Sequence, residues 1–161
     1  MPRDYIEEYR ELHKSPLFCK GGAVAPYLKD IGDLIRQTKA KTVLDYGCGK
    51  AQFSRGMNYA DLWGVSLSMY DPAVDMFSMR PEGRFDGVIC TDVLEHVENP
   101  EWVIQDIFSY ATRFVFLSIS CKPADKTFAD GTNLHINVHP KEWWLDRIKT
   151  NLLLDVRFDV P

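Results

Sequence analysis

The sequence lacks the features that mark membrane, secreted and nucleic-acid-binding proteins. No apolar run approaches the ~18 residues that a membrane span needs. The first residues, MPRDYIEEYREL, are charged instead of apolar, unlike a signal peptide. Basic residues are not in excess, because 19 Lys and Arg stand against 23 Asp and Glu, and they form no stripe. We therefore expect a cytoplasmic protein whose main partner is neither a membrane nor a nucleic-acid backbone.

Paired cysteines are absent as well. None of the four cysteines forms a Cys-x-x-Cys pair, and three of them lie in or beside apolar, strand-like runs; they are Cys19, Cys48, Cys90 and Cys121. A free cysteine in such a run behaves as a small hydrophobic residue, so we expect reduced core thiols and neither disulfides nor metal ligands. This expectation suits a reducing compartment.

The hydrophobic pattern alternates between helical and strand periods along a chain long enough for one domain. Helices are expected over 4–14, 24–38, 52–59, 102–111 and 142–150, and strands over 42–46, 63–70, 85–91, 114–120 and 152–160. Strands that alternate with helices imply parallel crossovers and a sheet covered on both faces. We predict a single α/β domain over 1–161, with N-terminal helices in 1–39, a core in 40–120 and a final segment in 121–161.

A glycine-rich loop joins the first predicted strand to a helix, in the run TVLDYGCGKAQ at 42–52. Gly47 and Gly49 permit positive φ angles and allow a ligand to approach the backbone closely. The helix that follows presents unpaired N–H groups to an anionic group. The same pattern is also typical of a tight strand-to-helix turn that binds nothing.

Acidic residues stand at the ends of three predicted strands: Asp45, Asp71 and Asp92. In open α/β sheets, ligands bind at the carboxyl ends of strands, so three acids at one edge favour a shared crevice. Asp71 follows Gly47 by 24 residues, slightly more than the ~20-residue spacing of ribose-binding acids in dinucleotide folds. Asp71 could instead only cap the turn that Pro72 opens.

Three segments together resemble class I (Rossmann-like) S-adenosylmethionine (SAM)-dependent methyltransferases. DYGCGKAQ is similar to their first motif, D/E-x-G-x-G-x-G, with Ala51 in place of the third glycine. YDPAV at 70–74 resembles the acidic end of their second strand, and FDGVICTDVLEHVENP at 85–100 resembles their fourth-strand segment. The resemblance spans roughly residues 40–120 and implies a three-layer sandwich around a mostly parallel sheet that binds SAM and releases S-adenosylhomocysteine (SAH).

The resemblance also implies roles for single residues. Gly47 and Gly49, with their neighbours, would approach the methionyl part of SAM, and Asp71 would accept hydrogen bonds from its ribose. Residues of the fourth-strand segment would line the floor near the sulfonium. The cofactor-binding candidates are Asp45, Tyr46, Gly47, Cys48, Gly49, Tyr70, Asp71, Thr91, Asp92 and Val93.

The chain departs from the family pattern between Asp71 and Asp86. Only 14 residues separate them, too few for a crossover helix, a strand and two connections. We therefore expect the family's third strand to be shortened or lost, with Met76 and Phe77 bounding the adenine unless they only cover the sheet edge. The chain also has one terminal strand where the family has an antiparallel hairpin, so the sheet is expected to be reduced at both ends.

Polar and apolar residues alternate after the turn signal Asp130-Gly131. In an extended segment, Asn133, His135, Asn137 and His139 would share one face beside the expected methyl acceptor. The element D-G-x-N-x-H, followed by P-x-x-W-W, resembles short bacterial and phage methyltransferase-like proteins. His135 is the first candidate for a general base, with Asp92 and His96 as alternates. His135 and His139 could bind a metal, but no further ligand stands at suitable spacing, so no metal is predicted.

These features favour a SAM-dependent methyltransferase (EC 2.1.1.-) acting on a small-molecule acceptor, with nucleic acid not favoured. Two alternatives stay open. One is a non-catalytic module that keeps SAM or SAH as a bound ligand, which a reduced third-strand edge would suit. The other is a nicotinamide-dependent oxidoreductase, although Gln52 breaks the Gly-x-Gly-x-x-Gly motif that such enzymes use.

Overall fold

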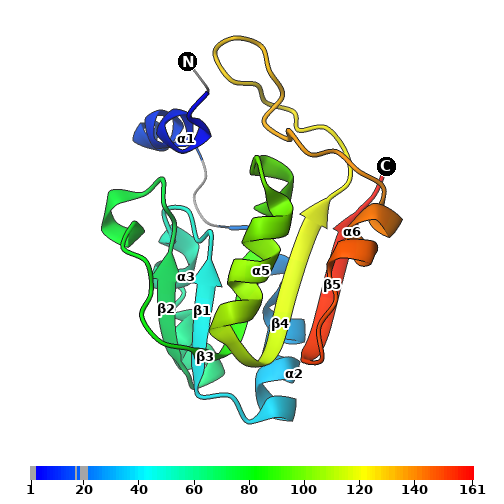
Figure 1. Cartoon of the computed structure of the whole chain (residues 1–161). Coiled ribbons are helices and arrows are strands. Elements are labelled where there is room, and N and C mark those ends of the chain that lie inside the picture. Colours follow the sequence, from blue (N-terminus) through cyan, green and yellow to red (C-terminus); the bar gives the residue numbers. More distant parts are fainter. Residues whose placement is uncertain (1–2, 17, 19–21) are drawn as a thin grey trace.

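A computed structural model describes residues 3–16, 18 and 22–161, and within them the strands form one five-stranded sheet (Figure 1). The strands are β1 (Thr42–Tyr46), β2 (Ser66–Tyr70), β3 (Phe85–Thr91), β4 (Ala111–Ser120) and β5 (Leu153–Asp159). Their order is β2-β1-β3-β4-β5, and every neighbouring pair is parallel. The sequence prediction of a Rossmann-like α/β fold is confirmed.

Helices bury both faces of this sheet. On one face, α2 (Leu28–Thr38) and α4 (Tyr59–Trp63) pack against the sheet through a cluster that includes Ile31 and Phe116. On the other face, α5 (Pro100–Tyr110) and α6 (Lys141–Arg147) pack through a second cluster that includes Ile107 and the fully buried Trp144. Parallel strands covered on both faces explain why the strand sequences are continuous apolar runs.

Two further segments lie beyond the carboxyl ends of the strands (Figure 1). Helix α1 (Tyr5–Lys14) begins at the N-cap Asp4, and residues 121–140 form a long irregular segment after β4. The Arg3 guanidinium joins the two segments, because it forms an ion pair with Asp130 at 2.8 Å.

The structure corrects the sequence prediction between β1 and β2. The single helix predicted over 52–59 is two short helices, α3 (Gln52–Gly56) and α4, and Trp63 belongs to α4 instead of opening a strand. Asn58 has a positive φ of 48° and its side chain accepts a hydrogen bond from the Asp61 N–H, which starts α4 anew. The Trp63 indole donates to the Leu28 carbonyl at 3.1 Å and so fastens α4 to α2.

The expected loss of the third strand is confirmed. Of the residues between β2 and β3, all of which are described, only Asp75–Phe77 form a regular element, the 3₁₀ helix η2. Arg80 fastens this connection to α5, where its guanidinium pairs with Asp106 and donates to the Tyr110 hydroxyl. At the other edge of the sheet, β5 is the outer strand and pairs with β4 in parallel, so the described residues form no antiparallel hairpin there.

The structure also bears on the expectations about cysteines and membrane spans. Cys48, Cys90 and Cys121 are buried, as expected of cysteines in apolar runs, and Cys19 lies outside the described residues. None of the helices in the described ranges is long and apolar enough to cross a membrane.

The pairing of β3 with β4 depends on the absence of a side chain at Gly87, which lies opposite Phe114. A Cβ atom placed on Gly87 would lie 2.1 Å from the Phe114 ring, which is fully buried. We expect Gly87→Ala to lower the free energy of unfolding by about 2 kcal/mol or more, because a packed core resists added volume. Gly56→Ala is the control, since a Cβ there meets no atom within 4 Å. Equal urea-unfolding midpoints for the two variants would contradict this account.

Candidate functional site

The loop after β1 has the left-handed backbone that its glycines allow. Gly47 has a φ of 77° and Gly49 a φ of 55°. Ala51, which stands where the first motif has its third glycine, keeps the same conformation with a φ of 49°. A non-glycine residue in this region costs about 1–2 kcal/mol. The loop therefore retains the three-glycine shape even though the third glycine is replaced.

Asp71 holds this loop against the end of β2. One carboxylate oxygen accepts the Gly49 N–H at 2.8 Å, and the other accepts the Ala73 N–H at 2.9 Å. The Tyr70 carbonyl accepts the N–H groups of Gly47 and Cys48, at 2.7 and 3.1 Å. The loop geometry is thus fixed by the neighbouring strand before any ligand is present.

Asp45 is the buried acid beneath the loop. It is 2% exposed, and its burial, together with the nearby Asp71 carboxylate, raises its pKa to about 7. A carboxyl group with this pKa is close to half protonated at neutral pH. Asp45 therefore differs from Asp71, which is held by two backbone N–H groups.

Residues 91–93, at the end of β3, connect the loop to the far side of the sheet edge. The Val93 side chain covers Gly47 so closely that a Cβ on that glycine would lie 2.3 Å from Val93 Cγ2. Asp92 has a φ of 54° and is fastened to β4, because its carboxylate accepts the Ser118 hydroxyl at 2.7 Å and its N–H donates to the Ser118 carbonyl. Partial desolvation raises the pKa of Asp92. Thr91, just before it, is buried.

Four of the residues predicted to bind the cofactor lie around the glycine-rich loop and Asp71 in different ways. The Tyr46 hydroxyl donates to Asp106 on α5, and Tyr46 and Tyr70 pack together in the core, so only their backbones reach the loop. The Phe77 carbonyl accepts the Asp71 N–H at 3.0 Å, which places η2 beside the acid. Met76 is 71% exposed beside Arg55.

Helix α1 covers this region, which the sequence patterns did not reveal. Arg10 donates to the Pro72 carbonyl at 3.1 Å and pairs with Asp75 at 3.4 Å. The Lys50 ammonium, inside the glycine-rich loop, donates to the Ser15 carbonyl. Burial lowers the pKa of His13. The nearby Asp71 charge acts to raise this pKa, and the Lys50 charge acts to lower it. The helical period of 4–14 predicted the helix, but nothing in its sequence indicated where it would dock.

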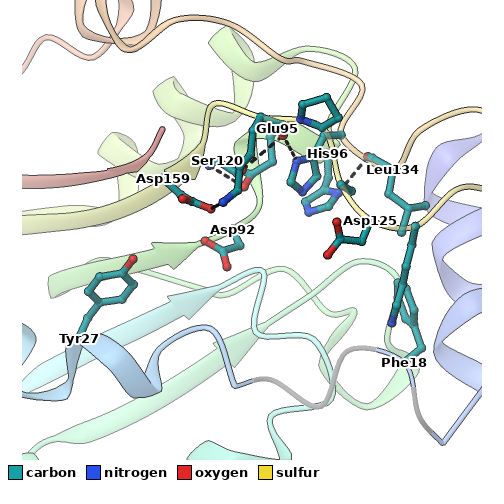
Figure 2. Close-up of a pocket in the computed structure, with 14 residues that line it drawn as sticks. Phe18, Tyr27, Asp92, Glu95, His96, Ser120, Asp125, Leu134 and Asp159 are labelled. Carbon is teal, nitrogen blue, oxygen red and sulfur yellow. Dashed lines mark hydrogen bonds and ion pairs between the residues drawn. The ribbon is translucent and has the colours of Figure 1, made fainter. Parts of the chain in front are cut away.

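A pocket of about 570 Å³ opens on the other side of Asp92 (Figure 2). Its walls come from the ends of β3 and β4, from η3 (Leu94–His96), from the 121–140 segment and from Tyr27. The lining residues are Phe18, Tyr27, Asp92, Glu95, His96, Ser120, Lys122, Pro123, Ala124, Asp125, Lys126, Leu134, His135 and Asp159. All three predicted candidates for a base, His135, Asp92 and His96, therefore line one pocket.

Three titratable side chains meet in its wall. One potential metal-ligating atom each of Glu95, His96 and His135 lies within 4.8 Å of the others, and the two imidazole rings are 4.6 Å apart, edge to face. Burial raises the pKa of Glu95 to about 8 and lowers that of His96 to about 4. At neutral pH, both groups are therefore largely uncharged in the absence of a ligand.

The predicted row of four polar side chains does not face one way, which corrects the expectation of an extended segment. Asn133 bonds the Ala124 backbone, Asn137 donates to the Val97 carbonyl, and His139 stacks on Trp143 with ring centroids 3.8 Å apart. Only His135 of the four lines the pocket. The segment is irregular because its polar side chains satisfy backbone groups of the chain around it, in place of strand pairing.

The comparisons with known proteins agree with this geometry. A family described as "Methyltransferase domain" matches residues 21–152. The match covers the glycine-rich loop, Asp71, and both elements that bring His96 and His135 to the pocket. No curated protein matches the sequence.

The buried Asp45 predicts a distinctive dependence of stability on pH. Its folded-state pKa of about 7 lies above the unfolded value of 3.8, so its contribution to stability is lost as the pH rises from about 4 to about 7. We expect Asp45→Asn to gain stability relative to the natural chain across that window, in urea unfolding without added ligand. A difference that stays flat with pH would contradict the buried, protonated carboxyl.

Asp86 provides a control of opposite sign. The Lys41 and Thr42 N–H groups lower the pKa of Asp86, so its contribution is present above pH ~4 and lost as the pH falls through the lowered value. We expect Asp86→Asn to be less stable than the natural chain at neutral pH, with the difference shrinking in acid.

The contact of Val93 with Gly47 gives a second prediction. Gly47→Ala is expected to destabilise the fold more than Gly64→Ala, because Gly64 has a similar φ of 64° but open space around it. Combining Gly47→Ala with Val93→Ala should recover part of the loss, with a coupling energy of about 1 kcal/mol or more. Additive effects in chemical unfolding would show that Val93 is not what excludes a side chain at position 47.

Proposed function

The chain belongs to the family of methyltransferase domains, and from that premise we propose that it transfers a methyl group from SAM to a small molecule held beside Asp92. The observation that carries the proposal is the position of residues 92–93. Val93 packs on the glycine-rich loop, whereas Asp92 lines the pocket. A donor on the loop and an acceptor in the pocket would thus meet across two adjacent residues.

The loop and Asp71 suit the methionyl and ribose parts of SAM. A carboxylate has about four acceptor positions, and the two backbone N–H groups that Asp71 binds use only one on each oxygen. The remaining positions can accept the two ribose hydroxyls. Gly49 has no Cβ, so the methionyl part can approach the loop backbone there, whereas at Gly47 the Val93 side chain occupies the space that a Cβ would take.

The adenine would then lie over η2. Asp71 and η2 are joined by the bond from the Asp71 N–H to the Phe77 carbonyl, so a ribose on Asp71 extends toward Met76 and Phe77. The exposed Met76 offers an apolar, adaptable surface of the kind that flat rings contact. This surface replaces the wall that the missing third strand would have supplied.

The protein's own part in the reaction is mainly to hold and to shield. Bound SAM supplies a methyl group already activated by a positively charged sulfur. The pocket residues align the acceptor and exclude water, and alignment of this kind can lower a barrier by about 7–11 kcal/mol. Where the acceptor carries a proton, His135, Asp92 and His96 are the groups placed to hold or remove it.

The size and chemistry of the pocket favour a small molecule over a macromolecule. Its volume of about 570 Å³ falls in the ~300–1,000 Å³ range of small-molecule sites. The net charge of −4 gives no attraction for a nucleic-acid backbone. We place the reaction in the cytoplasm, where free thiols such as Cys90 remain reduced.

Calorimetric titration with SAH and with NADH tests the cofactor. We expect SAH to bind and NADH not to bind. Asp71→Asn should weaken SAH binding by roughly 10- to 100-fold, because hydrogen bonds to a charged group are worth about 1.5–3 kcal/mol. Asp61→Asn is the control, since Asp61 is exposed on α4. Unchanged SAH affinity in the Asp71 variant would remove that residue from the cofactor site.

Incubation with methyl-labelled SAM and a small-molecule extract tests the reaction itself. Transfer of the label to an extract component, with release of SAH, is the expected result. Binding of SAM without any labelled product would instead favour a module that holds SAM or SAH as a ligand.

A further inference from the structure

We propose that Glu95, His96 and His135 form a binding site for a divalent transition-metal cation in the wall of the pocket. The three side chains come from two distant parts of the chain, η3 and the 121–140 segment, and folding brings their ligand atoms within 4.8 Å of one another. Two imidazoles and one carboxylate are the ligand set of several protein metal sites.

One oxygen of the Glu95 carboxylate is buried without a partner among the described residues. Glu95 is fully buried, and its Oε1 accepts the Ser120 N–H at 2.8 Å. Its other oxygen, Oε2, is buried without a hydrogen-bond partner. A buried polar atom left unpaired costs about 1–3 kcal/mol, so such atoms are rare in folded proteins. A cation bound between this oxygen and the two imidazoles would satisfy it.

Both imidazoles are oriented for coordination by the hydrogen bonds of their Nδ1 atoms. His135 Nδ1 lies 2.6 Å from the Lys122 carbonyl, and His96 Nδ1 lies 3.0 Å from the Leu134 carbonyl. A carbonyl oxygen only accepts, so each Nδ1 carries the proton and each Nε2 keeps its lone pair. Metal-ligating histidines characteristically donate their other N–H in this way, which fixes the ring and its tautomer.

Helix α1 supports the same arrangement. The Tyr9 hydroxyl lies 2.7 Å from His96 Nδ1 and 3.1 Å from the Leu134 carbonyl. When Tyr9 donates to the carbonyl, its oxygen can accept from Nδ1, and the single Nδ1–H is then shared between the Tyr9 hydroxyl and the Leu134 carbonyl. Tyr9 is therefore a positioning residue for His96, and its ring packs edge to face on that imidazole at 5.6 Å.

The donor set selects the class of metal. Imidazole nitrogens with one carboxylate suit Zn²⁺, Co²⁺, Mn²⁺ or Fe²⁺, whereas Ca²⁺ and Mg²⁺ prefer oxygen ligands alone. Three protein ligands leave at least one coordination position, as in catalytic metal sites. All three residues line the pocket, so the open position is available to a molecule bound there. If the proposed methyl transfer holds, a bound cation would occupy the lone pairs of His96 and His135, leave Asp92 as the candidate base and favour an acceptor that coordinates through an oxygen.

Titration of the protein with Co²⁺ in the absence of SAM tests the site by absorption spectroscopy. We expect one equivalent to bind, to give visible d–d bands, and to be displaced by Zn²⁺. Glu95→Gln and His135→Ala should each weaken binding by more than about 100-fold, since loss of a second-shell partner alone costs about 10- to 100-fold. His139→Ala is the matched control, because His139 is a partly exposed histidine in the same segment but outside the cluster.

The Co²⁺ titration tests the metal site independently of the proposed methyl transfer. Absence of a Co²⁺ spectrum, or a spectrum that both cluster variants retain, would overturn the site. Loss of binding in His139→Ala with retention in His135→Ala would also overturn it. Circular dichroism of each variant checks folding, and His135, which is only partly buried, decides the matter if Glu95→Gln does not fold. A metal site without SAH binding would leave this inference standing and sink only the proposed function.

Discussion

Parallel pairing of β1 with β2 on one side and β3 on the other is the constraint on which the site depends. Tyr46 lies level with Tyr70, and Asp45 with Ile89, so all three strands end at one edge. Strand pairing alone therefore brings the polar residues that follow each strand close together. No direct contact between those residues is needed to place them. At that edge, the 121–140 segment forms one wall of the pocket, and α1 packs over the connection that follows β2.

The features that could be predicted from the sequence are those that depend on a few consecutive residues. The glycine-rich loop and Asp71 are each recognisable within a few residues, because their backbone requirements are local. The lost third strand was predictable from chain length, since the 14 residues after Asp71 cannot hold a helix and a strand. The break at Asn58 could not be predicted. The hydrophobic pattern indicates one helix there, but the left-handed conformation of this single residue divides the helix in two.

The cluster of Glu95, His96 and His135 could not be predicted from spacing, because 38 residues lie between the two histidines. Alternation along the chain associated His135 with His139 instead, and that pattern assumes an extended backbone. The segment is irregular, so residues two apart point in different directions, and His139 turns to Trp143. A signal was nevertheless present, because Glu95 and His96 stand side by side, and only three residues separate Glu95 from the end of β3.

The reduced sheet has consequences for how the protein behaves in a crowded solution. Each outer strand of an open sheet carries a row of unpaired backbone groups that can recruit a strand from another molecule. At one edge, β2 is only five residues long, which limits the length of any such pairing. At the other, β5 carries Asp155, Arg157 and Asp159 at alternate positions. A strand added to β5 would have to accommodate these charges, which disfavours edge-to-edge pairing at this side of the sheet.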